Sequence, residues 1–332
     1  MVPSKRIWFA IARVFPAACC RVIFNKMDLS KSQNTILNVD SHKVSGAVYA
    51  ASAFLIWGMC PVYWKALRAV PALEIILHRV VWSFFFLVPI VMTMRRWKEI
   101  VDVLKNHRTL LTLLVSALIL GGNWLLYIWA INNDYLLQAS LGYYINPLVN
   151  VVLGMVFLKE RLRPPQMLSV LMAFTGVLYL TISYGEFPWI ALILALSFGL
   201  YGLIRKVAPV GALVGLTVET LLLSVPALIY LFYLDSRGAG TIFRVSLKLS
   251  LLLMGCGLVT AIPLLLFTLG ARRIYLSNLG LLQYIAPSGM FILAVFLYRE
   301  PFSSAEVVTF IFIWTALAIY STDSLHYYRG HK

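Results

Sequence analysis

Long apolar runs alternate with short polar segments from about residue 44 to the end of the chain. Each run has about 20 residues, the length of an α-helix that crosses a lipid bilayer. The segments between the runs are too short to form a separate extramembrane domain. The pattern therefore predicts an all-α membrane protein with ten transmembrane helices. We expect them at about residues 45–64, 73–93, 109–131, 135–158, 166–183, 187–204, 211–233, 248–270, 277–297 and 303–321.

The composition excludes a water-soluble fold. The 332-residue chain is 61% hydrophobic and only 12% charged, whereas about 25% of the residues of a soluble domain are charged. The net charge of +15 raises the question of nucleic-acid binding. However, the basic residues lie between the apolar runs, where the positive-inside rule places them. We therefore expect the lipid bilayer as a partner and no nucleic acid.

The distribution of Lys and Arg predicts the orientation. With the N-terminus in the cytoplasm, the outer loops hold six of these residues, namely Lys65, Arg68, Arg237, Arg244, Lys248 and Arg299. The inner loops and the C-terminal tail then hold fourteen: Arg95, Arg96, Lys98, Lys105, Arg108, Lys159, Arg161, Arg163, Arg205, Lys206, Arg272, Arg273, Arg329 and Lys332. This asymmetry predicts that both termini are cytoplasmic.

Residues 1–43 form a basic N-terminal extension. Its apolar stretch is interrupted by Arg13 and is too short to span a bilayer. It suits a basic amphipathic helix at the membrane surface or a targeting segment. The alternative, which we favour, is that translation begins at Met27. The extension carries no chemistry that we assign.

A sequence motif occurs twice at a spacing of 140 residues. LGYYINP at 141–147 matches LLQYIAP at 281–287. A second pair, WGMCPVYWK at 57–65 and FGLYGLIRK at 198–206, is offset by 141. Each unit then contains five helices, and because five is odd the second unit must enter the membrane upside down. Inverted repeats are typical of secondary transporters, whose site lies between the repeats near the bilayer midplane.

The same spacing sets the domain boundaries. We expect the first repeat at 44–184, the second at 185–323 and a cytoplasmic tail at 324–332. Lys159-Glu160 corresponds to Arg299-Glu300, one pair at each end of the bundle. These pairs either hold the two ends closed or are ordinary solvated surface pairs.

The motifs quoted above resemble the RarD branch of the EamA family. The resemblance includes ALSFGLYGLIRK and the segment ALRAVPALEIILHRVVWS, which directly follows WGMCPVYWK. This family belongs to the drug/metabolite transporter superfamily. The resemblance covers about residues 44–323. It implies a multi-pass carrier of the bacterial inner membrane, built from two EamA repeats and linked to chloramphenicol sensitivity. The extension at 1–43 lies outside the family pattern.

Polar residues inside the spans are the candidates for a substrate pathway, because polar groups in lipid are costly unless they face a cavity or a partner. Tyr143, Asn146 and Asn150 follow i, i+3, i+7 spacing and share one helical face. Pro147 removes one backbone hydrogen bond and frees a carbonyl for a ligand. The alternative is that these groups only join neighbouring helices. The other candidates for the pathway are Gln283, Tyr284, Pro287, Asn123 and Tyr127.

Three ionisable residues are candidates for gating or coupling. Arg79 would hold an anionic group or close a gate, or would instead extend toward the outer lipid headgroups. His78, next to it, would titrate near neutral pH. Glu219 lies about 12 Å into its span at 1.5 Å per residue, where it would exchange a proton or bind a cationic substrate. The alternative for Glu219 is a structural pair with Arg79 or a hydrogen bond to a neighbouring helix.

These observations favour a carrier that moves a small organic metabolite or drug by alternating access. The spans contain no H-E-x-x-H, G-x-S-x-G or acidic metal pair, so we expect neither an enzyme nor a metal site or cofactor. A channel or a non-transporting membrane protein is the alternative. The chain has no G-x-x-x-x-G-K-[ST] motif, so transport would use a gradient, exchange or downhill flow. A monomer and a homodimer both suit this architecture.

Overall fold

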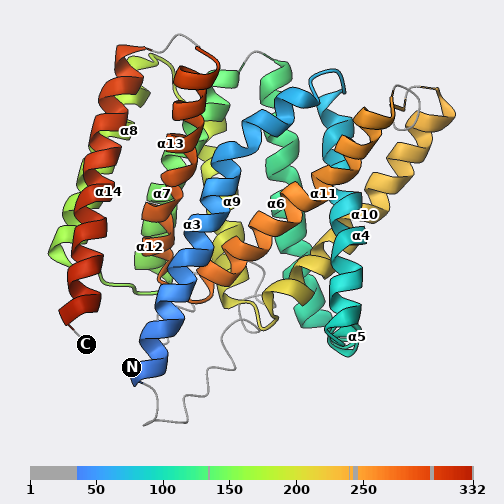
Figure 1. Cartoon of the computed structure of the whole chain (residues 1–332), viewed down its shortest axis with the longest axis horizontal. Coiled ribbons are helices and arrows are strands. Elements are labelled where there is room, and N and C mark those ends of the chain that lie inside the picture. Colours follow the sequence, from blue (N-terminus) through green and yellow to red (C-terminus); the bar gives the residue numbers. More distant parts are fainter. Residues whose placement is uncertain (1–35, 134, 239, 242–245, 300–302, 331–332) are drawn as a thin grey trace.

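The computed structural model describes residues 36–133, 135–238, 240–241, 246–299 and 303–330. Ten helices in these ranges are long and apolar enough to cross a membrane. Each of these spans begins and ends within three residues of an expected run. The prediction of an all-α membrane protein with ten spanning helices is confirmed, and Figure 1 shows the helices arranged as one bundle.

The first half contributes five of these helices. They are α3 (Ile36–Ala66), α4 (Ala72–Thr93), α6 (His107–Asn132), α7 (Leu136–Phe157) and α8 (Pro164–Ser183). The second half contributes α9 (Trp189–Val207), α10 (Ala212–Ser236), α11 (Leu247–Ala271), a ninth span in three pieces, and α14 (Ser304–Gly330). The three pieces are α12 (Leu276–Gln283), α13 (Ile285–Ile292) and the π-helix η1 (Leu293–Leu297).

Two features extend beyond the apolar runs. A short amphipathic helix, α5 (Trp97–Lys105), follows α4; it buries Ile100 and Val103 and leaves half of Trp97 exposed. This segment is charged and only nine residues long, so a search for apolar runs of 20 residues misses it. In addition, α14 continues through the expected tail as far as Gly330. Most of the expected N-terminal extension, residues 1–35, lies outside the described residues.

The two halves pack against each other through corresponding helices. The second, fourth and fifth helices of one half contact their counterparts in the other: α4 with α10, α7 with α12, and α8 with α14. The first and third helices exchange partners, so that α3 packs on α11 and α9 packs on α6. Figure 1 shows α8 beside α14 at one edge of the bundle and α4 beside α10 at the other. This exchange of partners is consistent with an inverted repeat.

The backbone also contains a repeated irregularity. Lys159 and Arg299, which are 140 residues apart, have φ values of 55° and 53°. Residues other than glycine rarely adopt this left-handed conformation. An uncommon geometry at corresponding positions is again consistent with two related units.

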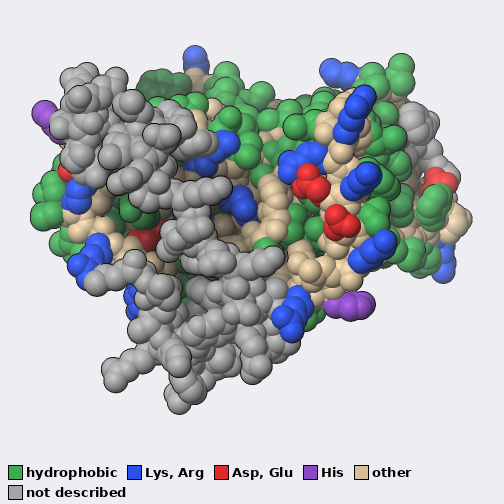
Figure 2. Space-filling model, turned by 90° about the horizontal axis from the view of Figure 1, so that it is seen from below, with side chains coloured by type: hydrophobic (Ala, Val, Ile, Leu, Met, Phe, Trp, Pro, Cys, Tyr) green, Lys and Arg blue, Asp and Glu red, His purple; other side chains and the backbone are tan. Residues whose placement is uncertain are grey.

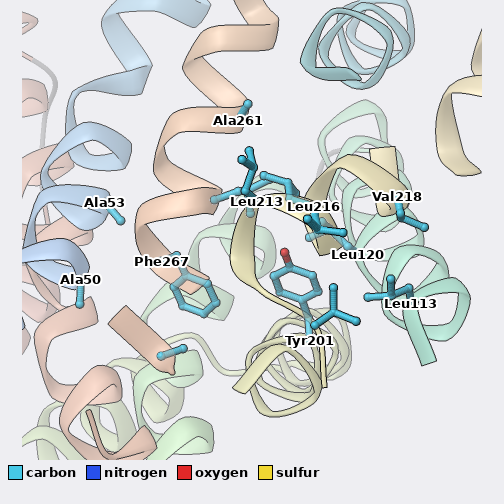
Figure 3. Packing of buried hydrophobic residues seen from close by; sticks show 14 of the residues in the cluster. Ala50, Ala53, Leu113, Leu120, Tyr201, Leu213, Leu216, Val218, Ala261 and Phe267 are labelled. Atoms are coloured by element: carbon cyan, nitrogen blue, oxygen red, sulfur yellow. The ribbon is translucent and has the colours of Figure 1, made fainter. Parts of the chain in front are cut away.

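The largest hydrophobic cluster joins the halves between α3, α6, α9, α10 and α11. Figure 3 shows part of this cluster, with Phe267 and Tyr201 side by side among aliphatic side chains. The two rings are stacked with centroids 6.2 Å apart, and Phe267 also lies 5.7 Å from the ring of Trp57. Because these residues come from both halves, apolar contacts hold the halves together.

Glycine permits close helix crossings at corresponding places. A Cβ atom on Gly58 of α3 would lie 3.4 Å from the Cα of Gly289 in α13. A Cβ atom on Gly199 of α9 would lie only 2.8 Å from Val149 of α7. Small residues let helix backbones approach in this way in membrane proteins. The crossings bring α3 and α13, and α9 and α7, close enough to surround a shared space.

One end of the bundle is basic. The described chain begins and ends at this end, where α3 starts and α14 finishes (Figure 1). Seen from below, this face carries Lys and Arg side chains spread across its surface (Figure 2). It is the face that the positive-inside rule predicts to be cytoplasmic. Below we call it the basic end and the other the mouth end.

Candidate functional site

A cavity of about 1240 Å³ lies between the two halves. Ligand pockets usually have volumes of about 300–1,000 Å³, so the space is large enough for a small organic molecule with its water. It reaches the surface at the mouth end, where Lys65, Arg68 and Ser303 line it and are exposed. Helices of both halves form its walls: α3, α4, α6, α7 and α8 from the first, and α9, α11, α12, α13, η1 and α14 from the second.

Proline shapes the backbone of the two corresponding helices at this cavity. Pro147 in α7 cannot donate to the carbonyl four residues before it, which belongs to Tyr143. Pro287 does the same to Gln283, and the ninth span is divided at Tyr284 between α12 and α13. Tyr143 and Gln283 are 140 residues apart and both line the cavity. The repeated motif therefore presents polar groups to the same space from both halves.

Three buried amide side chains lie at the inner part of this space. The Asn150 Nδ2 donates to Gln283 Oε1 at 2.7 Å, and the Gln283 Nε2 donates to Asn146 Oδ1. Asn146 also donates to the carbonyl of Ala195 in α9 at 2.6 Å. Asn146 and Gln283 line the cavity, whereas Asn150 is fully buried behind them. These bonds join α7, α9 and α12, so the amides contact the cavity and also connect the helices.

A second polar group comes from α6 and α7. The rings of Tyr127 and Tyr143 meet edge to face with centroids 5.9 Å apart, and both line the cavity. Asn123 lies in the same wall, where its Nδ2 donates to the carbonyl of Leu194 and to Ser197 Oγ. Such side chains offer an apolar surface and a polar edge to a ligand.

Arg79 lies in the cavity wall and is held from three directions. Its Nε donates to Thr260 Oγ1 of α11 at 2.9 Å. Its guanidinium carbon lies 4.8 Å from the ring centroids of both Trp64 and Trp124. All four residues line the cavity. The guanidinium therefore faces this space, about two helical turns from the start of α4, and contacts three helices.

His78 lies next to Arg79 in sequence but away from the cavity wall. Its Nε2 is 3.7 Å from Glu74 Oε1, and both side chains are buried. The same carboxylate oxygen accepts hydrogen bonds from the backbone N–H and the hydroxyl of Thr241, each at 2.8 Å. This group of residues connects α4 to the segment that follows α10.

Glu219 is completely buried in α10 and is also separate from the cavity wall. Its Oε1 lies 3.6 Å from the Nε of Arg205 in α9. Arg205 is itself fully buried and donates to the carbonyl of Ala212. A Cβ atom on Gly215 would lie 2.1 Å from Arg205, so only glycine leaves room for this side chain. The partner of Glu219 is thus Arg205 and not Arg79, the partner expected from the sequence.

The remaining candidates are Pro147 and Tyr284. Neither belongs to the cavity wall. Tyr284 is fully buried against α8 and α14, and its hydroxyl donates to the carbonyl of Tyr144 at 3.2 Å. The candidates that do line the cavity are Arg79, Asn123, Tyr127, Tyr143, Asn146, Gln283 and Pro287.

Beyond the amides, hydrogen bonds connect the two halves toward the basic end. The Glu160 carboxylate accepts from the backbone N–H of Leu276 at 2.7 Å and from the N–H and hydroxyl of Ser277 at 2.8 and 2.7 Å. These groups form the start of α12, where helices carry unpaired N–H donors and favour negative charge. Nearby, Lys206 of α9 donates to the carbonyls of Ala271 and Ile274, a contact within the second half.

The contact that Glu160 makes was not apparent from the sequence. The carboxylate binds a helix start instead of forming a surface pair with Lys159, and Glu300, its counterpart, lies outside the described residues. No local signal identifies this contact, because Glu160 and Ser277 are 117 residues apart. Only the recurrence of an acid 140 residues later, at Glu300, points to it.

At the mouth end the cavity is bordered by Tyr184 and Glu306. Partial burial and the negative charge of Glu306 raise the pKa of Tyr184 to about 12. The Tyr184 hydroxyl is therefore neutral at physiological pH. In the part of the chain that the structure describes, no group of His, Cys, Asp and Glu side chains is suited to hold a metal ion.

Comparison with known proteins identifies the family of the chain. The model of the EamA-like transporter family matches residues 44–182. "Protein RarD" of Salmonella typhi is 49% identical over 86% of this chain and 97% of its own. An "Uncharacterized transporter" of Vibrio cholerae is 50% identical over 86% of this chain and 94% of its own.

A solved crystal structure has the same fold, with a TM-score of 0.64 over 84% of this chain and 97% of its own, at 19% identity. The resemblance stated from the sequence motifs is therefore confirmed. The chain belongs to the EamA-like transporter family, within its RarD group, and is a multi-pass bacterial membrane transporter.

Proposed function

We propose that the protein is a secondary carrier that moves a small organic metabolite or drug across the inner membrane by alternating access. The observation that carries this proposal is the cavity between the two halves, which is lined at the mouth end by the exposed residues Lys65, Arg68 and Ser303. Toward the basic end, the amides and the Glu160 contact join the halves. With the basic end in the cytoplasm, this is an outward-open carrier with both termini inside.

Two related halves provide the mechanism. In a carrier built from inverted repeats, one half rocks against the other around a central site. The contacts that join the halves at the basic end would separate, while the corresponding parts of the two halves at the mouth end would come together. In this mechanism Asn123, Tyr127, Tyr143, Asn146, Pro287 and Gln283 form the substrate pathway, and Asn150, Pro147 and Tyr284 support it from behind.

The substrate class follows from the character of the cavity. Its aromatic and amide lining suits an organic molecule with apolar and polar parts, and the RarD resemblance adds chloramphenicol to the compounds to be tested. A channel filter is expected to have a ring of groups with one charge. In this cavity the polar groups are instead distributed over several helices. A carrier is therefore favoured over a channel, and a transporter over an enzyme.

Energy for uphill transport would come from an ion gradient or from exchange. Glu219 is the acidic residue that we propose for proton coupling, with Arg205 beside it. Glu219→Gln would then reduce proton-driven uptake more than it reduces substrate exchange. An equal loss of both activities would contradict this role.

Counterflow in proteoliposomes tests the carrier directly. Liposomes containing the purified protein are loaded with one candidate, diluted into buffer with a trace of the same labelled compound, and followed over time. The candidates are amino acids, nucleosides, purine derivatives and amphenicols. A carrier gives transient accumulation of label that depends on the internal compound, because exchange is faster than net movement. A channel gives equilibration without accumulation, which would contradict the proposal.

A further inference from the structure

The charges in the cavity wall are strongly unequal. Among the described residues, three cationic side chains, Lys65, Arg68 and Arg79, line it, whereas one acidic side chain, Glu306 at the mouth, does. Lys65 and Arg68 are exposed at the rim, so solvent screens them. Arg79 lies deeper, and among the described residues no carboxylate is within salt-bridge distance of its guanidinium. Within the described part of the chain, the inner part of the cavity therefore carries one cation without a protein counter-ion.

Placing a cation there is costly and calls for an explanation. An arginine inside a span costs about 2.5–3.5 kcal/mol on insertion scales, and a guanidinium stays protonated in proteins. Trp64 and Trp124 recover part of this cost, since a cation–π contact contributes about 0.5–2 kcal/mol. The same contacts orient the group, because an indole ring lies near the guanidinium from each of two helices, α3 and α6.

The hydrogen bonding of Arg79 is incomplete. Its Nε is occupied by Thr260, whereas its two terminal nitrogens make no hydrogen bond to the described residues. A guanidinium offers five N–H donors in a planar fork, and a carboxylate is the group that matches two of them at once. A positioned fork with unused donors in a cavity is the geometry of an anion-binding subsite.

The corresponding position in the second repeat makes the contrast clear. Glu219 lies 140 residues after Arg79, and its charge is opposed by Arg205 inside the protein. Arg79 has no such charged partner among the residues that the structure describes, and it faces the cavity instead. One member of the pair is neutralised by the fold, and the other is left for a ligand.

The remaining walls indicate what is attached to the anion. Trp57 of α3 and Phe198 of α9 meet edge to face with centroids 5.8 Å apart, and both line the cavity with Phe291. Asn146 and Gln283 add amide groups at the inner part. A compact polyanion would leave these aromatic surfaces in water, whereas a carboxylate with an apolar or aromatic body contacts both kinds of wall.

We propose that the transported molecule is an organic carboxylate with an apolar or aromatic body, and that Arg79 binds its carboxylate. The inference rests on the proposed carrier function and names the substrate class for the same cavity. It also predicts that uncharged molecules, amphenicols included, are weaker ligands than acids of similar size.

Matched acid and amide pairs test this inference by binding. The probes are indole-3-acetate with indole-3-acetamide, 3-phenylpropionate with 3-phenylpropionamide, and hexanoate with hexanamide. Each is added to the purified full-length protein, and the thermal unfolding midpoint is measured, because a ligand of the folded state raises it. We expect the acids to stabilise the wild type at concentrations at least tenfold lower than their amides require.

Substitutions at two cavity cations provide the control. Arg79→Gln is expected to abolish the preference for acids, and Arg79→Lys to keep part of it, because lysine retains the charge without the fork. Arg68→Gln, at the exposed rim, is expected to leave the preference unchanged. Equal stabilisation by acids and amides, stabilisation by no acid of the panel, or an acid preference that survives Arg79→Gln would overturn the inference.

A second measurement does not depend on the choice of ligand. Cys60 lines the same cavity as Arg79, and the other three cysteines, Cys19, Cys20 and Cys256, are replaced by serine. The rate of Cys60 modification is compared for the anionic sulfonatoethyl and the cationic trimethylammonioethyl methanethiosulfonates. We expect the anionic reagent to be favoured, and Arg79→Gln to lower the ratio of the two rates several-fold. A ratio unchanged by Arg79→Gln would contradict the anion site.

The outcomes separate this inference from the carrier proposal. Counterflow of an uncharged compound that is insensitive to Arg79→Gln, without acid-selective binding, would overturn the carboxylate inference and support the carrier. Acid-selective binding that depends on Arg79, without counterflow of any acid of the panel, would support the anion site and contradict the carrier.

Discussion

Arg79 and Glu219, 140 residues apart, are both the eighth residue of their helices, α4 and α10, and these helices pack against each other. Arg79 faces the central cavity, and Glu219 is enclosed beside Arg205. The same position of one fold thus holds opposite charges in opposite environments. In our account, the first repeat contributes the ligand contact and the second a buried ion pair.

The buried ion pair leads to a prediction about stability. Removing one member of a buried pair leaves an uncompensated charge and typically costs about 3–5 kcal/mol, whereas replacing both members with apolar residues is often neutral. We expect Glu219→Leu and Arg205→Met each to lower the unfolding temperature strongly. The double variant should recover most of the loss, as measured by thermal unfolding in detergent. Losses that simply add in the double variant would show that the two residues are not coupled.

A prediction about helix packing concerns Gly257 in α11. A Cβ atom there would lie 2.4 Å from the backbone carbon of Trp82 in α4, a contact that no side-chain rotation relieves. We expect Gly257→Ala to destabilise the protein by about 1–3 kcal/mol, the usual cost of overpacking. Gly122→Ala in α6 is the control, because nothing lies within 4 Å of its Cβ position. The two helical substitutions gain similar helix propensity, so equal unfolding temperatures would contradict the close crossing.

A third prediction concerns closure at the basic end. Glu160→Ala removes an acceptor from two backbone N–H groups and one hydroxyl at the start of α12. We expect faster hydrogen exchange in residues 276–280, because these amides lose their partner and the helix start opens more often. Arg161→Ala, an exposed neighbour, should leave the exchange unchanged. If exchange at α12 were the same in both variants, Glu160 would have no part in holding the halves together.

Substitutions in the amide cluster distinguish a role in the substrate pathway from a role in joining the helices. Gln283 lines the cavity, whereas Asn150 is buried behind it. We expect Gln283→Ala to raise the KM for counterflow at least tenfold, in addition to a loss of stability because Asn146 and Asn150 lose a hydrogen-bond partner. Asn150→Ala should act on stability without a comparable change in KM, by about 1–3 kcal/mol, since it leaves the buried amide oxygen of Gln283 without its donor. Effects of the same kind from both variants would favour helix contact as the role of the whole cluster.

Much of the fold could be predicted because the bilayer imposes a simple rule. In lipid, a spanning segment must form all its backbone hydrogen bonds internally, as an α-helix does. Runs such as 247–271 can therefore be recognised as spans from their length and hydropathy. The helix α5 escaped this rule because it is short, charged and amphipathic. The division of the ninth span at Tyr284 could not be predicted from the sequence either. Pro147 in α7 corresponds to Pro287 in the ninth span, but α7 is not divided.

The candidate site was predictable only in part. Repetition of the LGYYINP motif drew attention to Tyr143 and Gln283, which do line one cavity. Contacts between distant residues were out of reach: Glu160 with Ser277, or Arg205 with Glu219 across two helices. Helical periodicity predicts which residues share a face of a helix. It does not predict which other helix packs against that face, because this depends on the tertiary fold.

Sided labelling of a cysteine in the centre of the cavity tests the central claim most directly. Phe198 lies halfway along α9 and lines the cavity, so Phe198→Cys is introduced after the four native cysteines are replaced by serine. A membrane-impermeant maleimide is then added to right-side-out and to inside-out vesicles, with and without a compound that gives counterflow. Alternating access predicts labelling from both sides, with the compound shifting the ratio of the two rates. Labelling from one side only, under every condition, would contradict a carrier built around this cavity.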